Sequence, residues 1–136
     1  MSTHLANAGP VLPFTSEADH TAARGLFVKK GAAADGIVVV ANASTDIPVG
    51  VITDGSPSGA KSAVAVSGSG AIVKVKCAAT AGSIVLGSSL VLDGTTLGAV
   101  KLDPGTGARV QVARALEAGA NNALIDAVLI APQVLS

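Results

Sequence analysis

The sequence predicts an all-β fold, organised as a small β-barrel or sandwich. Valine-rich runs recur along the 136 residues, and clusters of Gly, Asp, Asn and Pro interrupt them at short intervals. About nine or ten short runs at roughly ten-residue spacing are typical of sandwiches and barrels. Helical periodicity is weak, so we expect at most one or two short helices.

The N-terminal segment, residues 1–24, is expected to form an extended arm that precedes a single β domain over residues 25–136. It carries both histidines, and its prolines favour an extended path around Val11 and Leu12. Val11, Leu12 and Phe14 are apolar groups on an otherwise polar segment, so they need burial somewhere. Two alternatives stay open: they contact a partner protein, or they fold back on the chain's own barrel.

From residue 26 onward, apolar β-branched runs mark the strands. Residues 37–41 form a continuous run, which predicts a strand buried on both faces. Pro48 favours an edge or the start of a strand, and Pro132 is expected to end the last one. No strict internal repeat is visible. The expected strands are 26–30, 37–41, 47–53, 63–66, 72–77, 83–86, 90–92, 97–101, 109–117 and 123–131.

The clearest alternation in the chain places Val73, Val75 and Cys77 on one side of a strand and Lys74 and Lys76 on the other. We expect one core face and one solvated face. The single cysteine excludes an intramolecular disulfide and a Cys-x-x-Cys pair. Its apolar setting predicts a buried small residue rather than a reactive thiol.

The composition argues against several classes of protein. Nine basic residues balance nine acidic ones, and Trp and Tyr are absent. Nucleic-acid binders usually show a basic excess or stacking rings. The N-terminus lacks a basic stretch followed by an apolar one, and no apolar run approaches ~18 residues, so we expect neither a signal peptide nor a membrane span.

The acidic residues predict turns rather than a catalytic site. Asp54, Asp93 and Asp103 each stand beside Gly or Pro, where an Asp side chain bonds to the local backbone. Asp126 interrupts the last strand, and we expect it to face solvent or to pair with a base such as Arg114.

Metal and phosphate sites lack a sufficient set of ligands. Glu17 and His20 lie three residues apart, but two ligands do not make a closed zinc site, which takes four. The Gly-x-Gly segments 68–70 and 105–107 lack the lysine and the spacing of phosphate loops. The sequence therefore predicts no catalytic, cofactor-binding or metal-binding residue.

Apolar residues make up 49% of the chain, but they are mainly Ala and Val, with two Phe. Such a core is thin, because Ala buries little area compared with an aromatic side chain. A thin core leaves a small surplus over conformational entropy. This favours burial of further surface against copies of the chain or against a larger partner.

Five segments follow one another in a characteristic order. The first is a strand that contains Gly-Val, and the second is a strand that ends at a Gly. The third is an Ala-Gly turn that leads to a Gly-x-x-Leu strand, the fourth is an Ala-x-Ala-Leu-Glu-Ala run, and the fifth is a closing apolar strand. In this order they resemble the capsid decoration, or cement, proteins of tailed bacteriophages. The segments are 48–55 (PVGVITDG), 64–75 (VAVSGSGAIVKV), 81–90 (AGSIVLGSSL), 114–118 (RALEA) and 123–132.

The resemblance implies a β-barrel-like or β-tulip-like protein that performs no reaction and needs no cofactor. Such a protein binds the outer surface of an assembled viral capsid and stabilises it. The implied partners are the major capsid protein and neighbouring copies of the chain in a homo-oligomer such as a trimer, with no nucleic acid and no membrane. The implied location is the outer capsid surface of the virion, after synthesis in the host cytoplasm. Val11, Leu12 and Phe14 are then the expected contact residues.

The alternative is a small β-rich ligand- or carbohydrate-binding module. Sugar sites usually use aromatic platforms, and this chain has no Trp or Tyr. An acid–base enzyme would need a cleft that gathers Asp126, Glu117 or His20. A lipoyl or biotin carrier would need a lysine at a hairpin tip, for which Lys61 is a poor match.

Overall fold

A computed structural model describes residues 11–136, which form ten β-strands and, within that range, no helix. The all-β class predicted from the sequence is therefore confirmed. None of the described residues belongs to a helix that is long and apolar enough to cross a membrane. The strands are β1 (Val11–Ser16), β2 (Phe27–Lys30), β3 (Gly36–Val39), β4 (Gly50–Asp54), β5 (Lys61–Val66), β6 (Ile72–Lys76), β7 (Ser89–Leu92), β8 (Val100–Leu102), β9 (Arg109–Ala115) and β10 (Leu124–Leu135).

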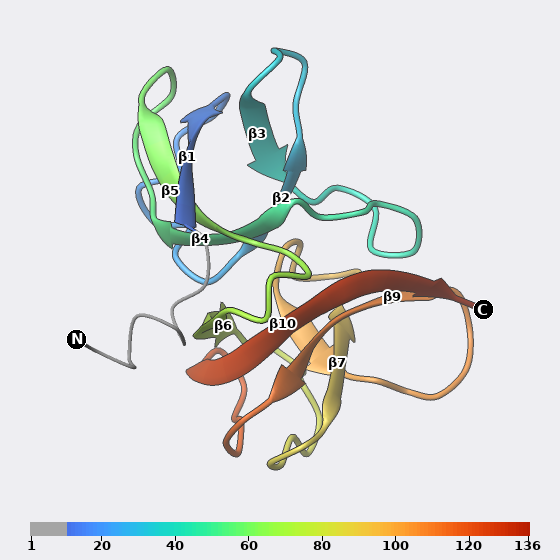
Figure 1. Cartoon of the computed structure of the whole chain (residues 1–136). Helices are drawn as coiled ribbons and strands as arrows, with labels where there is room; N and C mark the ends of the chain where they lie inside the picture. Colours follow the sequence, from blue (N-terminus) through green and yellow to red (C-terminus); the bar gives the residue numbers. More distant parts are fainter. Residues whose placement is uncertain (1–10) are drawn as a thin grey trace.

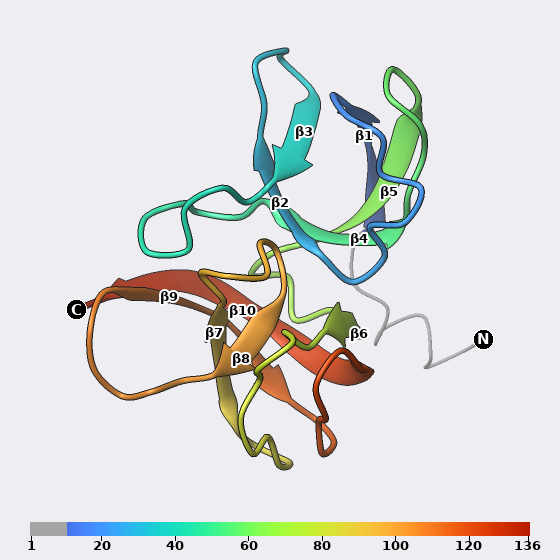
Figure 2. The ribbon, with the colours of Figure 1, turned by 180° about the vertical axis from the view of Figure 1, so that it is seen from behind.

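The strands form two units that pack against each other (Figure 1). Strands β1 to β5 close into a barrel in the order β1-β3-β2-β4-β5, and strands β6 to β10 form a sheet in the order β6-β10-β9-β7-β8. The view from behind shows the same division (Figure 2). A parallel bridge between Cys77 and Val100 joins the edges of the second sheet, so the second unit is itself nearly a barrel.

The barrel has a small apolar core of its own. Val28, Ile37, Ile52 and Val64 come from four different strands and are buried together. Phe14 of β1 packs against this cluster while remaining half-buried. Side chains alternate in direction along a strand, so the neighbours of these residues point outward from the barrel.

The outward-facing residues of the barrel share the largest core of the molecule with the second unit. Phe27, Val51 and Ala65 are fully buried in one cluster with Leu90 and Leu129 of the second unit. Phe27 pairs with Val51, and Val51 pairs with Ala65, so three adjacent strands present one apolar wall. Burial of this wall joins the two units into one folding body.

Backbone contacts hold the units together beside this wall. The N–H of Phe27 donates to the carbonyl of Gly98 at 2.9 Å, and the N–H of Lys76 donates to that of Gly25 at 2.9 Å. Gly98 has a φ of +80°, and a Cβ added there would lie 2.8 Å from Val39 Cγ1 and 3.2 Å from the carbonyl oxygen of Phe27. Glycine alone allows both this φ and this close approach without strain.

The two units share one topology. Read around each unit, the order is first, fifth, fourth, second and third strand: β1-β5-β4-β2-β3 in the barrel and β6-β10-β9-β7-β8 in the second unit. In both units the first strand meets the third in parallel. The remaining neighbouring pairs are antiparallel in both. No strict repeat is visible in the sequence, but the structure contains the same topology twice.

The pairing coincides residue by residue. The first strand bridges the third at Ser16–Ile37 in the barrel and at Cys77–Val100 in the second unit. After each bridge, the next N–H along the first strand donates to the carbonyl of the bridged residue, at 3.1 Å and 2.8 Å respectively. Further cross-strand pairs of the barrel have equivalents in the second unit. They are Val11–Ala65 with Ile72–Val128, Phe27–Val51 with Ser89–Arg114, and Val51–Ala65 with Arg114–Val128.

Positions with positive φ match as well. Gly25 and Gly87 have φ values of 85° and 89°, and Gly59 and Asn122 have values of 88° and 63°. Asn tolerates the left-handed region better than other residues with a Cβ, which explains this substitution. The chain therefore consists of two copies of one five-stranded unit, residues 11–66 and 72–129.

Most expected strands are present, with shifted ends, but the one expected over residues 83–86 is wrong. That segment is a loop, held by an isolated bridge between Ile84 and Gly119. The matching segment of the barrel, around Ala23, is also a connection between the first and second strands. An apolar run of this length does not by itself distinguish a strand from a packed loop.

Pro132 does not end the last strand. Strand β10 continues to Leu135, and its register against β9 shifts between Leu129 and Gln133. Proline has no N–H to give to a ladder, and an irregularity of this kind lets a strand pass through it.

The expected arm over residues 1–24 lies partly outside the described residues. Its described part belongs to the barrel, because β1 pairs with β5 from Val11 to Thr15 and with β3 at Thr15 and Ser16. A boundary at residue 24 would therefore cut through the barrel. Removal of β1 would leave β3 and β5 without the strand that joins them.

The junction between the units can be tested with a pair of glycines. Gly98→Ala and Gly105→Ala both place a Cβ at a φ near +80°, but nothing lies within 4 Å of a Cβ at position 105. We expect the φ alone to cost about 1–2 kcal/mol at either site. Crowding at the junction should add about 1–3 kcal/mol at position 98. Urea unfolding measures both values, and equal losses for the two variants would contradict the close packing described here.

Candidate interaction surface

The three residues expected to contact a partner all lie in strand β1. Val11 and Leu12 are 44% and 47% exposed, whereas Phe14 packs against the barrel core. Leu12 and Phe14 point to the same face of β1, because residues two apart in a strand do so. Phe14 thus folds onto the chain's own barrel, and Val11 and Leu12 remain at the surface.

A hollow of about 150 Å³ opens between β1 and the turn that joins β2 to β3. Phe14, Ile37 and Val49 give it a mainly apolar wall, and Lys30 and Asp35 add the charged groups. We call this feature the β1 hollow. It brings the apolar face of β1 together with residues that are distant in the sequence.

The amine of Lys30 is turned toward the β2–β3 turn. Its Nζ donates to the carbonyl of Gly31 at 3.0 Å and to that of Ala33 at 3.2 Å. Only the aliphatic stem of Lys30 is left to line the β1 hollow, as is usual for a lysine at the edge of an apolar surface.

The same turn is held to β1 by Glu17. Its carboxylate accepts hydrogen bonds from the backbone N–H groups of Ala32 and Ala33, both at 3.0 Å. A Cβ at Gly31 or Gly36 would run into this carboxylate. These two glycines leave room for the tether, which holds the Glu17 carboxylate against the turn.

Asp35 adds a second tether at the surface. It accepts a hydrogen bond from the Thr15 hydroxyl at 3.0 Å and forms an ion pair with Lys61. The hydrogen bond from Lys61 holds the pKa of the Asp35 carboxyl below its usual value. Both partners are about half exposed, so the pair adds little to stability.

A buried polar cluster lies at the end of β1. His20 is 2% exposed, and its Nδ1 lies 3.0 Å from Ser16 Oγ, which in turn lies 2.6 Å from Ser62 Oγ. Ser62 Oγ accepts a hydrogen bond from the N–H of Ser56 at 2.9 Å. Within the described chain, the other ring nitrogen of His20 has no hydrogen-bond partner.

Burial lowers the pKa of His20 from its ordinary value of 6.5, with Asp19 opposing the effect. The ring is thus held in its neutral form inside the fold. Glu17 and His20 are engaged in separate networks, and residues 11–136 contain no group of three or more residues suited to hold a metal ion.

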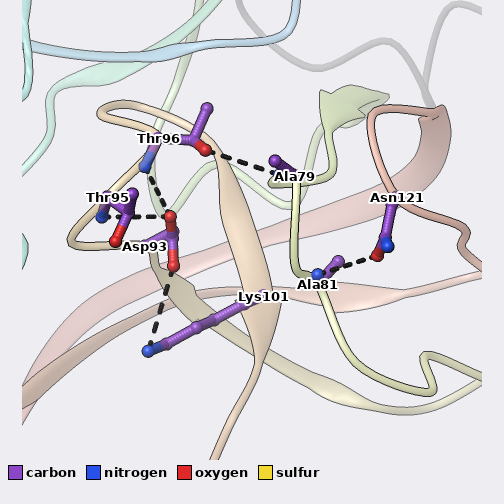
Figure 3. A network of polar contacts seen from close by, with 7 residues as sticks. All are labelled: Ala79, Ala81, Asp93, Thr95, Thr96, Lys101 and Asn121. Atoms are coloured by element: carbon purple, nitrogen blue, oxygen red, sulfur yellow. Dashed lines mark hydrogen bonds and ion pairs between the residues drawn. The ribbon is translucent and has the colours of Figure 1, made fainter.

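In the second unit a different carboxylate holds the equivalent turn, between β7 and β8. Asp93 accepts hydrogen bonds from the N–H groups of Thr95 at 3.1 Å and Thr96 at 2.5 Å (Figure 3). The hydroxyl of Thr96 then accepts a weaker hydrogen bond from the N–H of Ala79 at 3.4 Å. In both units one carboxylate caps two successive N–H groups of the turn between the second and third strands, although it comes from different places in the sequence.

In the second unit a buried core side chain stands at the matching place. Lys30 pairs with Ile37, and Leu92 pairs in the same register with Val100. Leu92 is only 2% exposed and packs in the core with Val75, which matches Phe14. The side chain of a leucine thus fills the space that the barrel leaves open beside Lys30.

A cluster of ion pairs lies on the second sheet, between β6, β10 and the segment after β9. Lys74 forms ion pairs with Glu117 at 3.3 Å and Asp126 at 3.2 Å, and these contacts raise its pKa. Asp126 is half exposed and pairs with a base, as expected, but the base is Lys74 rather than Arg114. Burial raises the pKa of the Cys77 thiol, as expected for a structural cysteine.

No protein-family model and no curated protein matches the sequence. Among solved structures, the chain is similar to the head fiber gp8.5 N base of bacteriophage phi29. The two share 19% sequence identity with a TM-score of 0.57, and the likeness covers 93% of this chain and 98% of that chain. This is a likeness of fold that extends over both five-stranded units.

The sequence pointed to Val11, Leu12 and Phe14 but missed the β1 hollow and the cluster around His20. Neither has a local signal, because each is assembled from segments that only the barrel brings together. Glu17 and His20, three residues apart, do not lie in a helix, and the two side chains point into different networks.

The cluster around His20 predicts acid sensitivity. A base whose pKa is lowered in the fold stabilises the protein fully above its unfolded pKa, and this contribution is lost as the pH falls below 6.5. We expect the free energy of unfolding to fall more steeply from about pH 7 to about pH 5 than in the His20→Gln variant, which keeps a polar group but cannot titrate. Parallel curves for the two proteins in urea titrations would refute this role.

Proposed function

We propose that this chain is a non-enzymatic structural protein that binds the outer surface of an assembled viral capsid and stabilises it. The observation that carries the proposal is the fold likeness to the base of a phage head fiber, which extends over nearly the full length of both chains. The sequence supports the same function independently through its resemblance to capsid decoration proteins.

The arrangement of the polar groups is consistent with a structural role. Glu17, Asp93 and Asp103 hold turns through backbone N–H groups, and Lys74 is engaged between two carboxylates. Lys30 and Asp35 are the only ionisable groups that line the β1 hollow in the described chain. A structural protein needs shape and apolar contact area rather than groups with tuned pKa values.

The mechanism is stabilisation by many weak contacts. A capsid presents many equivalent sites, so a modest affinity for each copy is multiplied over the lattice. The proposed contact uses Val11 and Leu12 at the surface and Phe14 behind them. The proposed partners are the major capsid protein and neighbouring copies of this chain, on the outside of the virion.

A small ligand- or carbohydrate-binding module is less well supported. The β1 hollow measures about 150 Å³, whereas ligand pockets usually span about 300–1,000 Å³. Lys30 and Asp35 are its only polar side chains in the described chain, and both are already engaged with neighbouring residues.

Binding to viral heads tests the proposal. Heads of the virus that encodes this chain, prepared without it, are mixed with the purified protein and sedimented. We expect saturable co-sedimentation, and filled heads that carry the protein should release DNA at a higher temperature than bare heads. Heads of an unrelated tailed phage serve as the control. Protein that stays in the supernatant with its own heads would remove the basis of the proposal.

A pair of surface variants tests the contact residues. Leu12→Asp places a charge where an exposed leucine is expected to become buried, and Val134→Asp makes the same change at a valine that is 53% exposed on β10. We expect at least about tenfold weaker binding to heads for Leu12→Asp, because the burial of one leucine is worth roughly that factor. Val134→Asp should bind normally. Equal binding by both variants would exclude Leu12 from the interface.

A further inference from the structure

We propose that the β1 hollow receives one apolar side chain, of about the size of leucine, from the major capsid protein. This inference rests on the function proposed above and names the chemistry of the contact. The hollow is one of the places where the first unit of the duplicated fold departs from the second, and the equivalent place in the second unit shows how the space can be filled.

The counterpart shows what the space accepts. In the second unit, Leu92 occupies the position of Lys30 and is buried against Val75 and Val100. The barrel has the same register there, with Phe14 and Ile37 as the matching neighbours. A leucine side chain thus fills the equivalent site in the second unit.

One sequence difference leaves the space open in the barrel, and a second lies at its rim. Lys30 stands in place of Leu92, and its amine bonds to the turn carbonyls instead of filling the site. At the rim, Ala34 lines the hollow at the position that Leu97 holds in the second unit, where Leu97 is 43% exposed. Ala34 and Leu97 are equivalent because the two turns share a hydrogen bond: the N–H of Gly36 donates to the carbonyl of Ala33, and the N–H of Ala99 donates to that of Thr96.

Leu12 extends the apolar surface beside the hollow. Leu12 points to the same face of β1 as Phe14 and is half exposed, whereas its counterpart Val73 packs against the core of the second unit. A partner surface that extends from the hollow along β1 would cover Leu12 as well. This continuity joins the hollow to the contact residues proposed for the capsid surface.

The backbone of β1 favours insertion of a side chain over addition of a strand. Thr15 directs its N–H toward β3, where it donates to Asp35 at 2.9 Å, so Val11 and Pro13 direct their backbone groups to the same side. Pro13 has no N–H, which leaves an added strand with Val11 as its single donor over residues 11–14. The partner therefore contacts this edge through side chains.

The size of the hollow fits one such group. Apolar cavities near 150 Å³ hold a benzene ring or a xenon atom, and a leucine side chain is of similar bulk. Because the wall is apolar and the site is open to one side, its complement is a single projecting aliphatic side chain rather than a polar or extended ligand.

Xenon tests the hollow in the isolated protein, independently of any capsid. In methyl-detected NMR, xenon should shift the resonances of Ile37 and Val49 in the natural protein. Ala34→Leu, which fills the hollow from the turn, should abolish these shifts, and Lys30→Leu should do the same from β2. Ala32→Leu, in the same turn but outside the lining, is the matched control. Absent shifts in the natural protein, or unchanged shifts in both filled variants, would overturn the proposal.

Binding to viral heads tests the partner. We expect Ala34→Leu and Lys30→Leu to bind heads at least about tenfold more weakly than the natural protein, with Ala32→Leu and the charge-matched Lys76→Leu unaffected. Failure of the natural protein to bind would count against the proposed function itself. Normal binding by the filled variants would refute only this inference. A change in self-association without a change in head binding would assign the hollow to a second copy and overturn the capsid assignment.

Discussion

The burial of the barrel's outer wall is the constraint on which the rest of the structure depends. Each five-stranded unit has fewer than about 60 residues, a size at which a single core is marginal. The inner core of the barrel is small, so Phe27, Val51 and Ala65 supply apolar area on its outside. Their burial against the second unit produces the largest core of the chain. The close approach at Gly98 follows from the same contact, because the turn of the second unit must reach the backbone of Phe27.

The two units share one pattern of strand pairing, but equivalent positions carry different side chains where the surroundings of the two units differ. Phe27 and Val51 are matched by Ser89 and Arg114, which occupy the equivalent outer wall of the second unit and are not buried. One wall is covered by a neighbour and the other faces solvent, so the same backbone needs apolar residues in one copy and polar ones in the other. The inner positions also differ in chemistry at two places. Lys30 is matched by Leu92, and the buried Ser16 and Ser62 are matched by Cys77 and Ile125. The β1 hollow and the cluster around His20 are thus the two places where the inner face of the barrel departs from that of the second unit.

The strands were largely predictable because their signals are local. The alternation around Lys74 and Lys76 identified β6 and its buried face, and Cys77 is buried as its apolar setting indicated. Pro132 misled the prediction of β10, since a register shift absorbs a proline that would otherwise end a ladder. The repeat could not be seen from the sequence. Between residues 50–66 and 113–129, which match without a gap, almost every position differs, and small apolar residues replace one another freely in a pleated sheet.

The sequence by itself determined the all-β class, the positions of most turns and the shortage of groups with tuned chemistry, because each depends on neighbouring residues. Only the tertiary structure decided that residues 11–16 close a barrel and that the chain contains two copies of one unit. It also decided that Phe14, Lys30 and Val49 surround a common hollow. These features depend on contacts between segments far apart in the chain, and pairing across a sheet is set by the burial of whole faces rather than by any single residue.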